Sequence, residues 1–309
     1  MPVCLFASAL YVATSQLSFL TALFCLHISD KQALFRTFAR EIPHYVTPMI
    51  KALFLDIDGT LVSFATHTIP ASTQLALRQA HEHGVKIMIA TGRPYYCIDN
   101  LSSIQDLIDG YICTNGSNCF VGQHTVHLQP LPDKAVRYIM QQCDIHQIPA
   151  VIVGIDKVAV YHFTQAANEA CYDLIHVDWQ KLSSPLEEVL QEPVVQVSPL
   201  NTAEQESEFF PNLQDCLSTR WCEAFSDITP LGVDKGKGIG YMARYLGFPI
   251  SETMALGDGG NDVPMFQCAG IGVAMGQSQP DVQAQADYVT SDVDHEGIAQ
   301  ALRHFGIID

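Results

Sequence analysis

The stretch that decides the fold is Lys51-Ala52-Leu53-Phe54-Leu55-Asp56-Ile57-Asp58-Gly59-Thr60-Leu61. An apolar run of strand length ends in two carboxylates, Asp56 and Asp58, followed by Gly59. Carboxylates avoid burial unless they are paired or bind a cation, so this pair indicates a functional site. In phosphoryl chemistry one carboxylate attacks phosphorus and a second exchanges protons with the leaving group. The alternative is an edge strand that ends in an Asp-rich turn.

A second apolar run, residues 85–90, leads into Thr91-Gly92-Arg93-Pro94. A hydroxyl and the following backbone N–H at the end of a strand suit an oxygen of a phosphoryl group. The alternative is an ordinary helix N-cap, because Thr is a common capping residue and Pro is common at the first helical position. Both interpretations can hold together.

A lysine follows late in the chain, in Gly232-Val233-Asp234-Lys235-Gly236-Lys237-Gly238, before a helical run over about residues 239–246. An ammonium group here would offset the charge between a nucleophile and a phosphoryl group. Lys235 and Lys237 are both candidates for this role. The spacing is not that of a phosphate-binding P-loop.

An acidic loop follows the strand predicted over residues 253–256 and reads Gly257-Asp258-Gly259-Gly260-Asn261-Asp262. If Asp56, Asp258 and Asp262 meet in one crevice, their charges repel and raise one another's pKa values. A hard divalent cation relieves this repulsion, and Mg²⁺ prefers such oxygen ligands.

These four motifs, in this order, resemble those of the haloacid dehalogenase-like (HAD) superfamily, and most closely the Cof-like phosphatases, over about residues 49–309. The resemblance implies Asp56 as the nucleophile that becomes an aspartyl-phosphate and Asp58 as the general acid–base. It assigns the phosphate contacts to Thr91, Gly92, Lys235 and Asn261, and its spacing favours Lys235 over Lys237. It assigns Mg²⁺ to Asp56, the backbone carbonyl of Asp58, Asp258 and Asp262, directly or through water.

The alternation of strands and helices predicts an α/β fold, with a Rossmann-like parallel sheet and helices on both of its faces. We expect the core domain over 49–121 and 226–309. Two adjacent strands near 149–163, joined by a tight turn, indicate an antiparallel hairpin. With the helices around them they predict an inserted α+β cap over 122–225, the large cap of the Cof-like subclass.

Residues 1–48 lie outside the resemblance. The apolar stretch from Val3 to Ile28 is long enough for a transmembrane helix, and Lys31, Arg36 and Arg40 would place the catalytic part in the cytoplasm. Two other interpretations are an over-extended or disordered start, because Met49 resembles the usual first residue of such phosphatases, and a packed helix.

The composition narrows the partners of the 309-residue chain. Its formal charge of −17 argues against nonspecific nucleic-acid binding. Ten cysteines without a zinc-ligand spacing indicate reduced thiols in a cytoplasmic protein.

The expected function is a Mg²⁺-dependent phosphomonoesterase that acts on a small phosphorylated metabolite, such as a sugar phosphate. The alternatives are a phosphosugar mutase and a catalytically inactive regulator that binds a phosphorylated metabolite. The sequence names neither the substrate nor the cap residues that select it.

Overall fold

The structure is a computed structural model that describes residues 49–309 apart from 176, 221 and 222. The expected extension over residues 1–48, with its three interpretations, lies outside the described residues. Within the described part of the chain, each helix is too short or too polar to span a bilayer.

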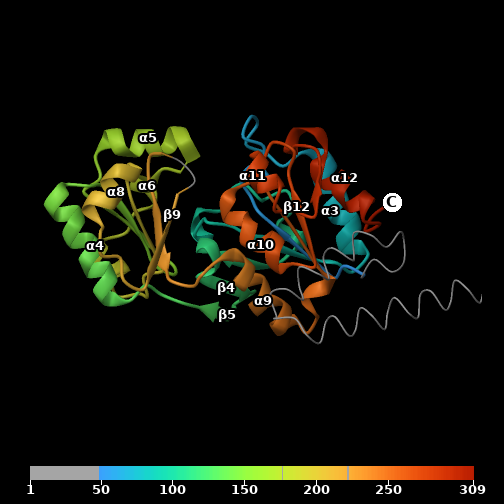
Figure 1. The fold of residues 1–309 in the computed structure, drawn as a ribbon, viewed down its shortest axis with the longest axis horizontal. Helices are drawn as coiled ribbons and strands as arrows, with labels where there is room; N and C mark the ends of the chain where they lie inside the picture. Colours follow the sequence, from blue (N-terminus) through green and yellow to red (C-terminus); the bar gives the residue numbers. More distant parts are fainter. Residues whose placement is uncertain (1–48, 176, 221–222) are drawn as a thin grey trace, which may run out of the picture. The chain divides into compact units, whose positions relative to one another are not determined.

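The first of two sheets has eight strands, which we call the core sheet (Figure 1). Six neighbouring strands are parallel, and two antiparallel strands extend one edge. In spatial order they are β13 (Tyr288–Val289), β12 (Ile271–Ala274), β11 (Thr253–Gly257), β1 (Ala52–Leu55), β2 (Lys86–Ala90), β3 (Ile108–Cys113), β4 (Asn118–Val121) and β5 (His124–Leu128). The expected parallel α/β core is therefore confirmed, with an antiparallel edge that the sequence did not predict.

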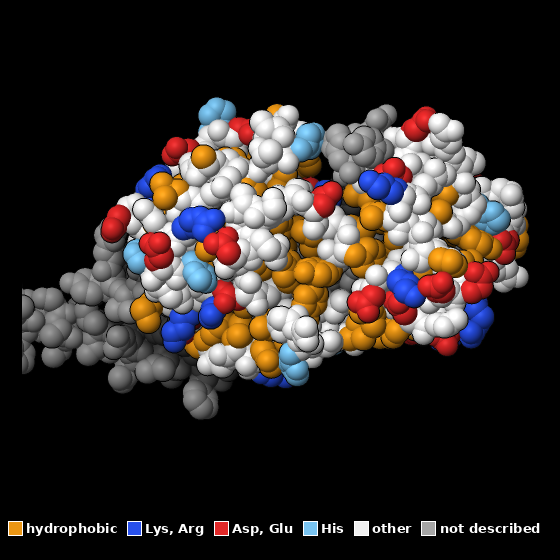
Figure 2. Space-filling view, turned by 180° about the vertical axis from the view of Figure 1, so that it is seen from behind, with side chains coloured by type: hydrophobic (Ala, Val, Ile, Leu, Met, Phe, Trp, Pro, Cys, Tyr) orange, Lys and Arg blue, Asp and Glu red, His pale blue; other side chains and the backbone are white. Residues whose placement is uncertain are grey.

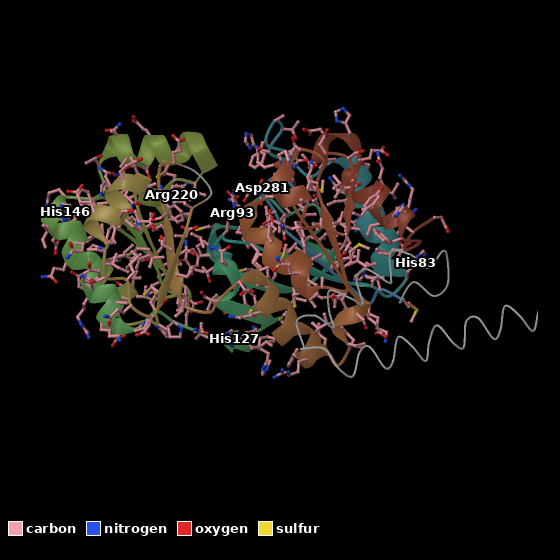
Figure 3. The ribbon with its side chains drawn as sticks, in the orientation of Figure 1. His83, Arg93, His127, His146, Arg220 and Asp281 are labelled. Carbon is pink, nitrogen blue, oxygen red and sulfur yellow. The ribbon has the colours of Figure 1, made fainter. Side chains whose placement is uncertain are left out.

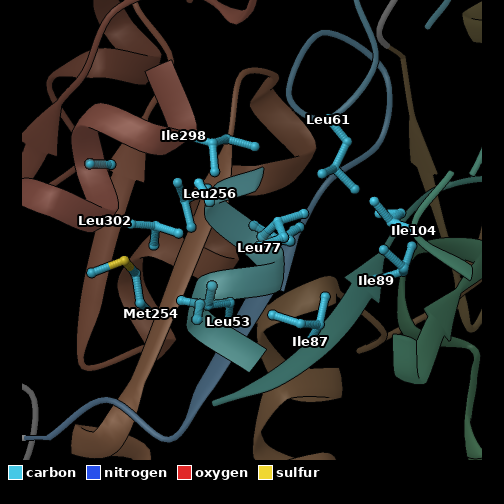
Figure 4. Close-up of a cluster of buried hydrophobic side chains, with 14 of the residues drawn as sticks. Leu53, Leu61, Leu77, Ile87, Ile89, Ile104, Met254, Leu256, Ile298 and Leu302 are labelled. Atoms are coloured by element: carbon cyan, nitrogen blue, oxygen red, sulfur yellow. The ribbon is translucent and has the colours of Figure 1, made fainter. Parts of the chain in front are cut away.

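Helices pack on both faces of the core sheet because successive strand residues point to opposite sides. On one face, Leu53 and Leu256 pack with residues of α3 (Ala71–Glu82) and α12 (Gly297–His304), as Figure 4 shows. On the other face, Phe54 packs with residues of α9 (Lys235–Leu246) and α10 (Val263–Cys268). A fully buried side chain of this kind contributes about 1.5–3 kcal/mol, so β1 is held from both sides.

The second sheet has five strands, all paired antiparallel, which we call the cap sheet. In spatial order they are β7 (Val158–Tyr161), β6 (Ala150–Val153), β8 (Gln196–Pro199), β10 (Asp227–Pro230) and β9 (Cys216–Thr219). The helices of this region are α4 (Asp133–His146), α5 (Gln165–Ile175), α6 (Trp179–Leu182), α7 (Leu186–Val189) and α8 (Ala203–Phe209). One face of the sheet, with Ile152, Val197 and Ile228, shares a buried cluster with α4. The expected α+β cap is present.

Strand membership differs from the boundaries expected at residues 122 and 225. β5 belongs to the core sheet and β10 to the cap sheet, so the chain leaves the core between residues 128 and 133 and returns between 230 and 235. The sequence missed the β4–β5 hairpin, whose turn contains Gly122 at a φ of +56°. Glycine adopts this left-handed conformation without steric cost.

The local sequence limits two helical segments. Residues 94–105 form no α-helix and hold two single 3₁₀ turns, Tyr95–Cys97 and Gln105–Leu107. Asp, Asn and Ser residues between them compete for backbone hydrogen bonds and disfavour a helix. α8 ends at Phe209, shortly before Pro211, because proline cannot continue a helix. The remaining described helical elements are α11 (Pro280–Gln283) and the 3₁₀ turns at Thr114–Gly116, Ile250–Glu252, Gly260–Asp262 and Val293–His295.

Candidate active site

Three carboxylates meet at one edge of the core sheet. Asp56 follows β1 and Asp258 follows β11, and these two strands are parallel neighbours, so their carboxyl ends adjoin. Asp262 stands directly before α10. Each of the three offers one oxygen, and these oxygens lie within 4.8 Å of one another.

The ammonium group of Lys235 lies among these carboxylates. Its Nζ donates to Asp262 Oδ1 at 2.6 Å and to Asp56 Oδ1 at 2.7 Å, and the side chain is fully buried. Burial alone lowers the pKa of Lys235, but the two carboxylates together outweigh it and raise the pKa above its ordinary value. Lys237, the rival candidate, instead donates to the carbonyl of Gly232. The structure thus brings Lys235, and not Lys237, to the carboxylates.

The carboxylates of the site outnumber the single ammonium group of Lys235, so the cluster is negatively charged. Burial, followed by repulsion from Asp262, raises the pKa of Asp56 well above its ordinary value, although Lys235 opposes this. Burial and repulsion from Asp262 also raise the pKa of Asp258 to about 7. One lysine does not neutralise this carboxylate group, and a hard divalent cation with oxygen ligands fits the donor set.

Asp262 organises the acidic loop as well as facing Lys235. Its Oδ2 accepts hydrogen bonds from the backbone N–H groups of Asp258 and Gly259, at 3.0 and 2.9 Å. Both of its carboxylate oxygens therefore already have donors. The Asp258 carboxylate has fewer hydrogen bonds than that of Asp262, since it accepts one bond of 3.4 Å from the Thr60 hydroxyl.

Asp58 is held by Arg93, a residue that the sequence analysis did not assign to the site. The guanidinium group donates through Nε to Asp58 Oδ2 and through Nη2 to Asp58 Oδ1, both at 2.8 Å. This is the two-pronged geometry for which arginine is suited. Arg93, labelled in Figure 3, lies in the turn after β2. A basic residue directly after Thr91-Gly92 was the available signal.

The predicted phosphate contacts lie at the same sheet edge. Thr91 follows β2, and its hydroxyl accepts a bond from the Arg93 N–H. Asn261 donates to Asn115, which lies in the turn after β3. A Cβ on Gly92 would stand 3.3 Å from the Asn115 amide, so these turns pack closely. The sequence analysis did not select Asn115.

Gly59 is required by its surroundings. Its φ is +83°, and a Cβ at this position would stand 2.3 Å from the Asp258 carboxylate and 2.6 Å from Phe64. A residue with a side chain would be strained by the backbone conformation and would also displace an acidic group of the site.

The site opens into a cavity of about 1070 Å³ that is also lined by residues of the cap. The core contributes the predicted residues Asp56, Asp58, Thr91, Gly92, Asp258 and Asn261. From the cap sheet come Gln196, Ser198 and Asp227, three polar residues that the sequence analysis did not select. The signal for the first two was the alternation of polar and apolar residues in Val195-Gln196-Val197-Ser198.

A Rossmann-like core with a carboxylate cluster at its strand ends, covered by a large α+β cap, defines a capped phosphoryl-transfer protein. Residues 53–302 match the family of haloacid dehalogenase-like hydrolases. The chain therefore belongs to this family. Within it, the architecture is that of the Cof-like phosphatases.

Individual relatives agree with this assignment. The chain is similar to the solved structure of the HAD subclass IIB sugar phosphatase BT4131, with 45% identity, a TM-score of 0.77, and coverage of 84% of this chain and 100% of that one. It is also similar to the structure of BT1666, a HAD phosphatase from Bacteroides thetaiotaomicron, with 34% identity, a TM-score of 0.76, and coverage of 86% and 98%. The 5-amino-6-(5-phospho-D-ribitylamino)uracil phosphatase YcsE of Bacillus subtilis (strain 168) is 26% identical, over 83% of this chain and 96% of its own.

Proposed function

We propose that this HAD phosphatase hydrolyses a small phosphorylated metabolite, of the sugar phosphate kind, with Mg²⁺ and through an aspartyl-phosphate on Asp56. The observation that carries the proposal is the meeting of Asp56, Asp258 and Asp262 around the buried ammonium of Lys235. Such a group combines a nucleophile, a cation site and a charge-neutralising lysine, and the three carboxylate oxygens lie within 4.8 Å of one another. BT4131, to whose structure this chain is similar, is a sugar phosphatase, and this supports the substrate class.

In the first chemical step an Asp56 carboxylate oxygen attacks phosphorus, and the bond from phosphorus to the leaving-group oxygen breaks. Asp58 donates a proton to that oxygen, so the metabolite departs as an alcohol. The Asp58 carboxylate in this structure is engaged by Arg93 through both oxygens. The hydrogen bonds between Arg93 and Asp58 must therefore break when Asp58 takes up and donates its proton. At other times Arg93 holds the Asp58 carboxylate in position.

In the second step Asp58 takes a proton from water, and the water oxygen attacks the phosphorus of the aspartyl-phosphate. The acyl–phosphate bond breaks, which returns Asp56 as a carboxylate and releases inorganic phosphate. Thr91, the Gly92 N–H, Lys235 and Asn261 hold the phosphoryl oxygens in both steps. Preorganised donors of this kind stabilise the charge that develops in the transition state.

The donor set supports a Mg²⁺ site. Asp56, Asp258, the backbone carbonyl of Asp58 and Asp262 would hold Mg²⁺, which neutralises the carboxylates and polarises the phosphoryl oxygens when bound. Both oxygens of Asp262 already accept bonds from Lys235 and from backbone N–H groups. This favours contact through water for Asp262 over direct ligation.

The two alternative functions have less support. A phosphosugar mutase must retain its intermediate and exclude water, whereas the cavity of about 1070 Å³ leaves room for water beside a small sugar. An inactive regulator is disfavoured because the nucleophile, the second acid and the acidic loop are all intact.

The proposed location of the protein is the cytoplasm. The seven cysteines in the described part of the chain are all free thiols, which agrees with a reducing compartment.

The test is phosphate release from p-nitrophenyl phosphate by the full chain, with Mg²⁺ and after chelation. We expect turnover that needs the metal, loss of turnover and of the phosphoenzyme in Asp56→Asn, and a decrease of about 10²–10⁴-fold in Asp58→Asn. Asp215→Asn, on an exposed cap carboxylate, is the matched control and should retain full activity. Activity that survives exhaustive chelation, or near-normal turnover of Asp56→Asn, would contradict the proposal.

A further inference from the structure

Three buried polar side chains form one hydrogen-bonded cluster on the cap sheet, which we call the cap trio: Gln196, Ser198 and Asp227. β8 and β10 are antiparallel neighbours, with Ile228 opposite Val197, so Asp227 faces Ser198 across the pair. Gln196 lies two residues from Ser198 and therefore on the same face. A polar cluster inside a small sheet costs stability unless it is fully satisfied.

Two of the three hydrogen bonds within the trio converge on one oxygen of Asp227. Its Oδ1 accepts from the Ser198 hydroxyl at 2.7 Å and from Gln196 Nε2 at 2.9 Å, and the same amide nitrogen donates to Ser198 at 2.9 Å. This network fixes the orientation of the three side chains. It also determines which atoms are left over.

The atoms left over are hydrogen-bond acceptors. Gln196 Oε1 is buried without a hydrogen-bond partner, and the hydrogen bonds described for Asp227 involve Oδ1 and leave Oδ2 without one. Among the described residues, no lysine or arginine forms an ion pair with Asp227, and its pKa is raised to about 6 by burial. At neutral pH both the carboxylate and the unpaired amide oxygen require donors. The Gln196 oxygen is enclosed, so the Asp227 carboxylate is the acceptor of the trio that a ligand in the cavity can reach.

The trio lines the same cavity as the phosphoryl site. Val151 and Trp179 line it as well, and belong to the apolar cluster next to the trio. Arg220, labelled in Figure 3, also lines the cavity, but its guanidinium group is bound by Asn201, Phe225 and Glu206. Among the described residues, the part of the cavity that the cap lines, which we call the cap end, thus combines hydrogen-bond acceptors with an apolar wall. The cations that contact the carboxylates of the phosphoryl site belong instead to the core.

We propose that the cap trio is the leaving-group subsite of this enzyme, and that it selects an uncharged, polyhydroxylated metabolite that donates a hydroxyl hydrogen bond to the Asp227 carboxylate, which Gln196 and Ser198 orient. The inference rests on the proposed phosphatase function. A sugar hydroxyl matches the carboxylate oxygen of Asp227 that has no donor, and the carbon-bound hydrogens of the same ring pack on Trp179 and Val151. A second phosphate or a carboxylate on the metabolite would face Asp227 with like charge, which disfavours it.

The experiment compares two substrates in the wild type and in Asp227→Asn, using the full chain with Mg²⁺. The amide of the variant keeps an oxygen for Ser198 and Gln196 but directs a donor, in place of an acceptor, to the cavity. We expect kcat/KM for a hexose 6-phosphate to fall by about 10–100-fold, the range for a hydrogen bond to a charged group. For p-nitrophenyl phosphate, whose leaving group carries no hydroxyl donors, we expect no change.

Asp215→Asn is the matched control, since it removes an exposed carboxylate paired with Lys134 at the start of β9. It should leave both substrates unchanged. A thermal melt of Asp227→Asn shows whether the variant folds, and Ser198→Ala, which loosens the same carboxylate, should reduce hexose phosphate turnover selectively but less.

The outcomes distinguish a failure of the proposed subsite from a failure of the proposed phosphatase function. If the wild type releases no phosphate from either substrate, the proposed function fails. If it does, equal effects of Asp227→Asn on both substrates, or none on the hexose phosphate, would overturn the subsite. A wild-type preference for an amino-sugar phosphate or a bisphosphate over the neutral hexose phosphate would overturn it as well.

Discussion

The buried carboxylates at the two ends of the cavity have different kinds of hydrogen-bond partner. At the core end, Asp56 and Asp262 share the ammonium of Lys235, and Asp58 has the guanidinium of Arg93. At the cap end, Asp227 has a hydroxyl and an amide as partners and no described cation. Charged partners suit chemistry in which a phosphoryl anion arrives and charge moves. Neutral partners leave a carboxylate free to accept from neutral donors, which suits recognition.

The surface does not show the same division. On the face in Figure 2, lysine and arginine side chains are scattered among acidic ones on both the core and the cap. The net charge of −17 is therefore not offset by a basic patch on this face. At the site itself, the cations Arg93 and Lys235 lie beside carboxylates, where the dielectric screening is weaker than in water.

The largest expected effect tests the charged partners of the core end. Lys235→Met removes the only cation that contacts Asp56 and Asp262 among the described residues. It should lower the free energy of unfolding by about 3–5 kcal/mol, the usual cost of leaving a buried charge unpaired. Urea denaturation at neutral pH measures this, and Lys237→Met is the control, because that exposed side chain should matter by about 0.5 kcal/mol or less.

If Lys235→Met were as stable as the wild type, the carboxylates at the core end would not depend on their cation, and the contrast between the two ends would fail. Addition of Mg²⁺ gives a second measurement on the same variant. A cation that binds the folded state raises the melting temperature, so the variant should regain part of its lost stability in Mg²⁺.

The next effect tests the cap end. Burial raises the pKa of Asp227 from 3.8 to about 6 in the folded state, so the folded protein binds the proton more tightly than the unfolded chain. The stability cost of its charge is absent below about pH 4 and grows as the pH rises to about 6. Because Asn carries no charge, Asp227→Asn should gain about 2–3 kcal/mol relative to the wild type between about pH 4 and pH 8.

Chemical denaturation at a series of pH values measures this difference, with Asp215→Asn as the control for removing a cap carboxylate. A gain in stability together with the selective loss of hexose phosphate turnover would show that Asp227 is kept for function at the expense of stability. A variant less stable than the wild type at about pH 8 would mean that the trio holds the cap sheet together.

The sequence predicted the core end far better than the cap end, for a physical reason. The acidic motifs end hydrophobic strands, and parallel strands bring their carboxyl ends to one edge, so local patterns determine which residues meet. The predicted core range of 226–309 places Asp227 in the core, whereas β10 belongs to the cap sheet. The partners of Asp227, Gln196 and Ser198, are some thirty residues away, and only the register of β8 and β10 brings them together. No local pattern encodes a register of this kind.

Arg93 was only partly predictable from the sequence, and its substitution provides the smallest expected effect. It stands in the turn quoted from the sequence, yet its partner Asp58 is 35 positions away. Arg93→Lys keeps the charge but not the two-pronged contact, and we expect kcat to fall by about tenfold, within the range of coupling between contacting residues. If Arg93 acts by positioning Asp58, the loss should disappear when Asp58→Asn is already present. A loss of equal size in both backgrounds would instead mean that Arg93 contacts the substrate or the phosphoryl group itself, and the core end would then have a second cation for its anion.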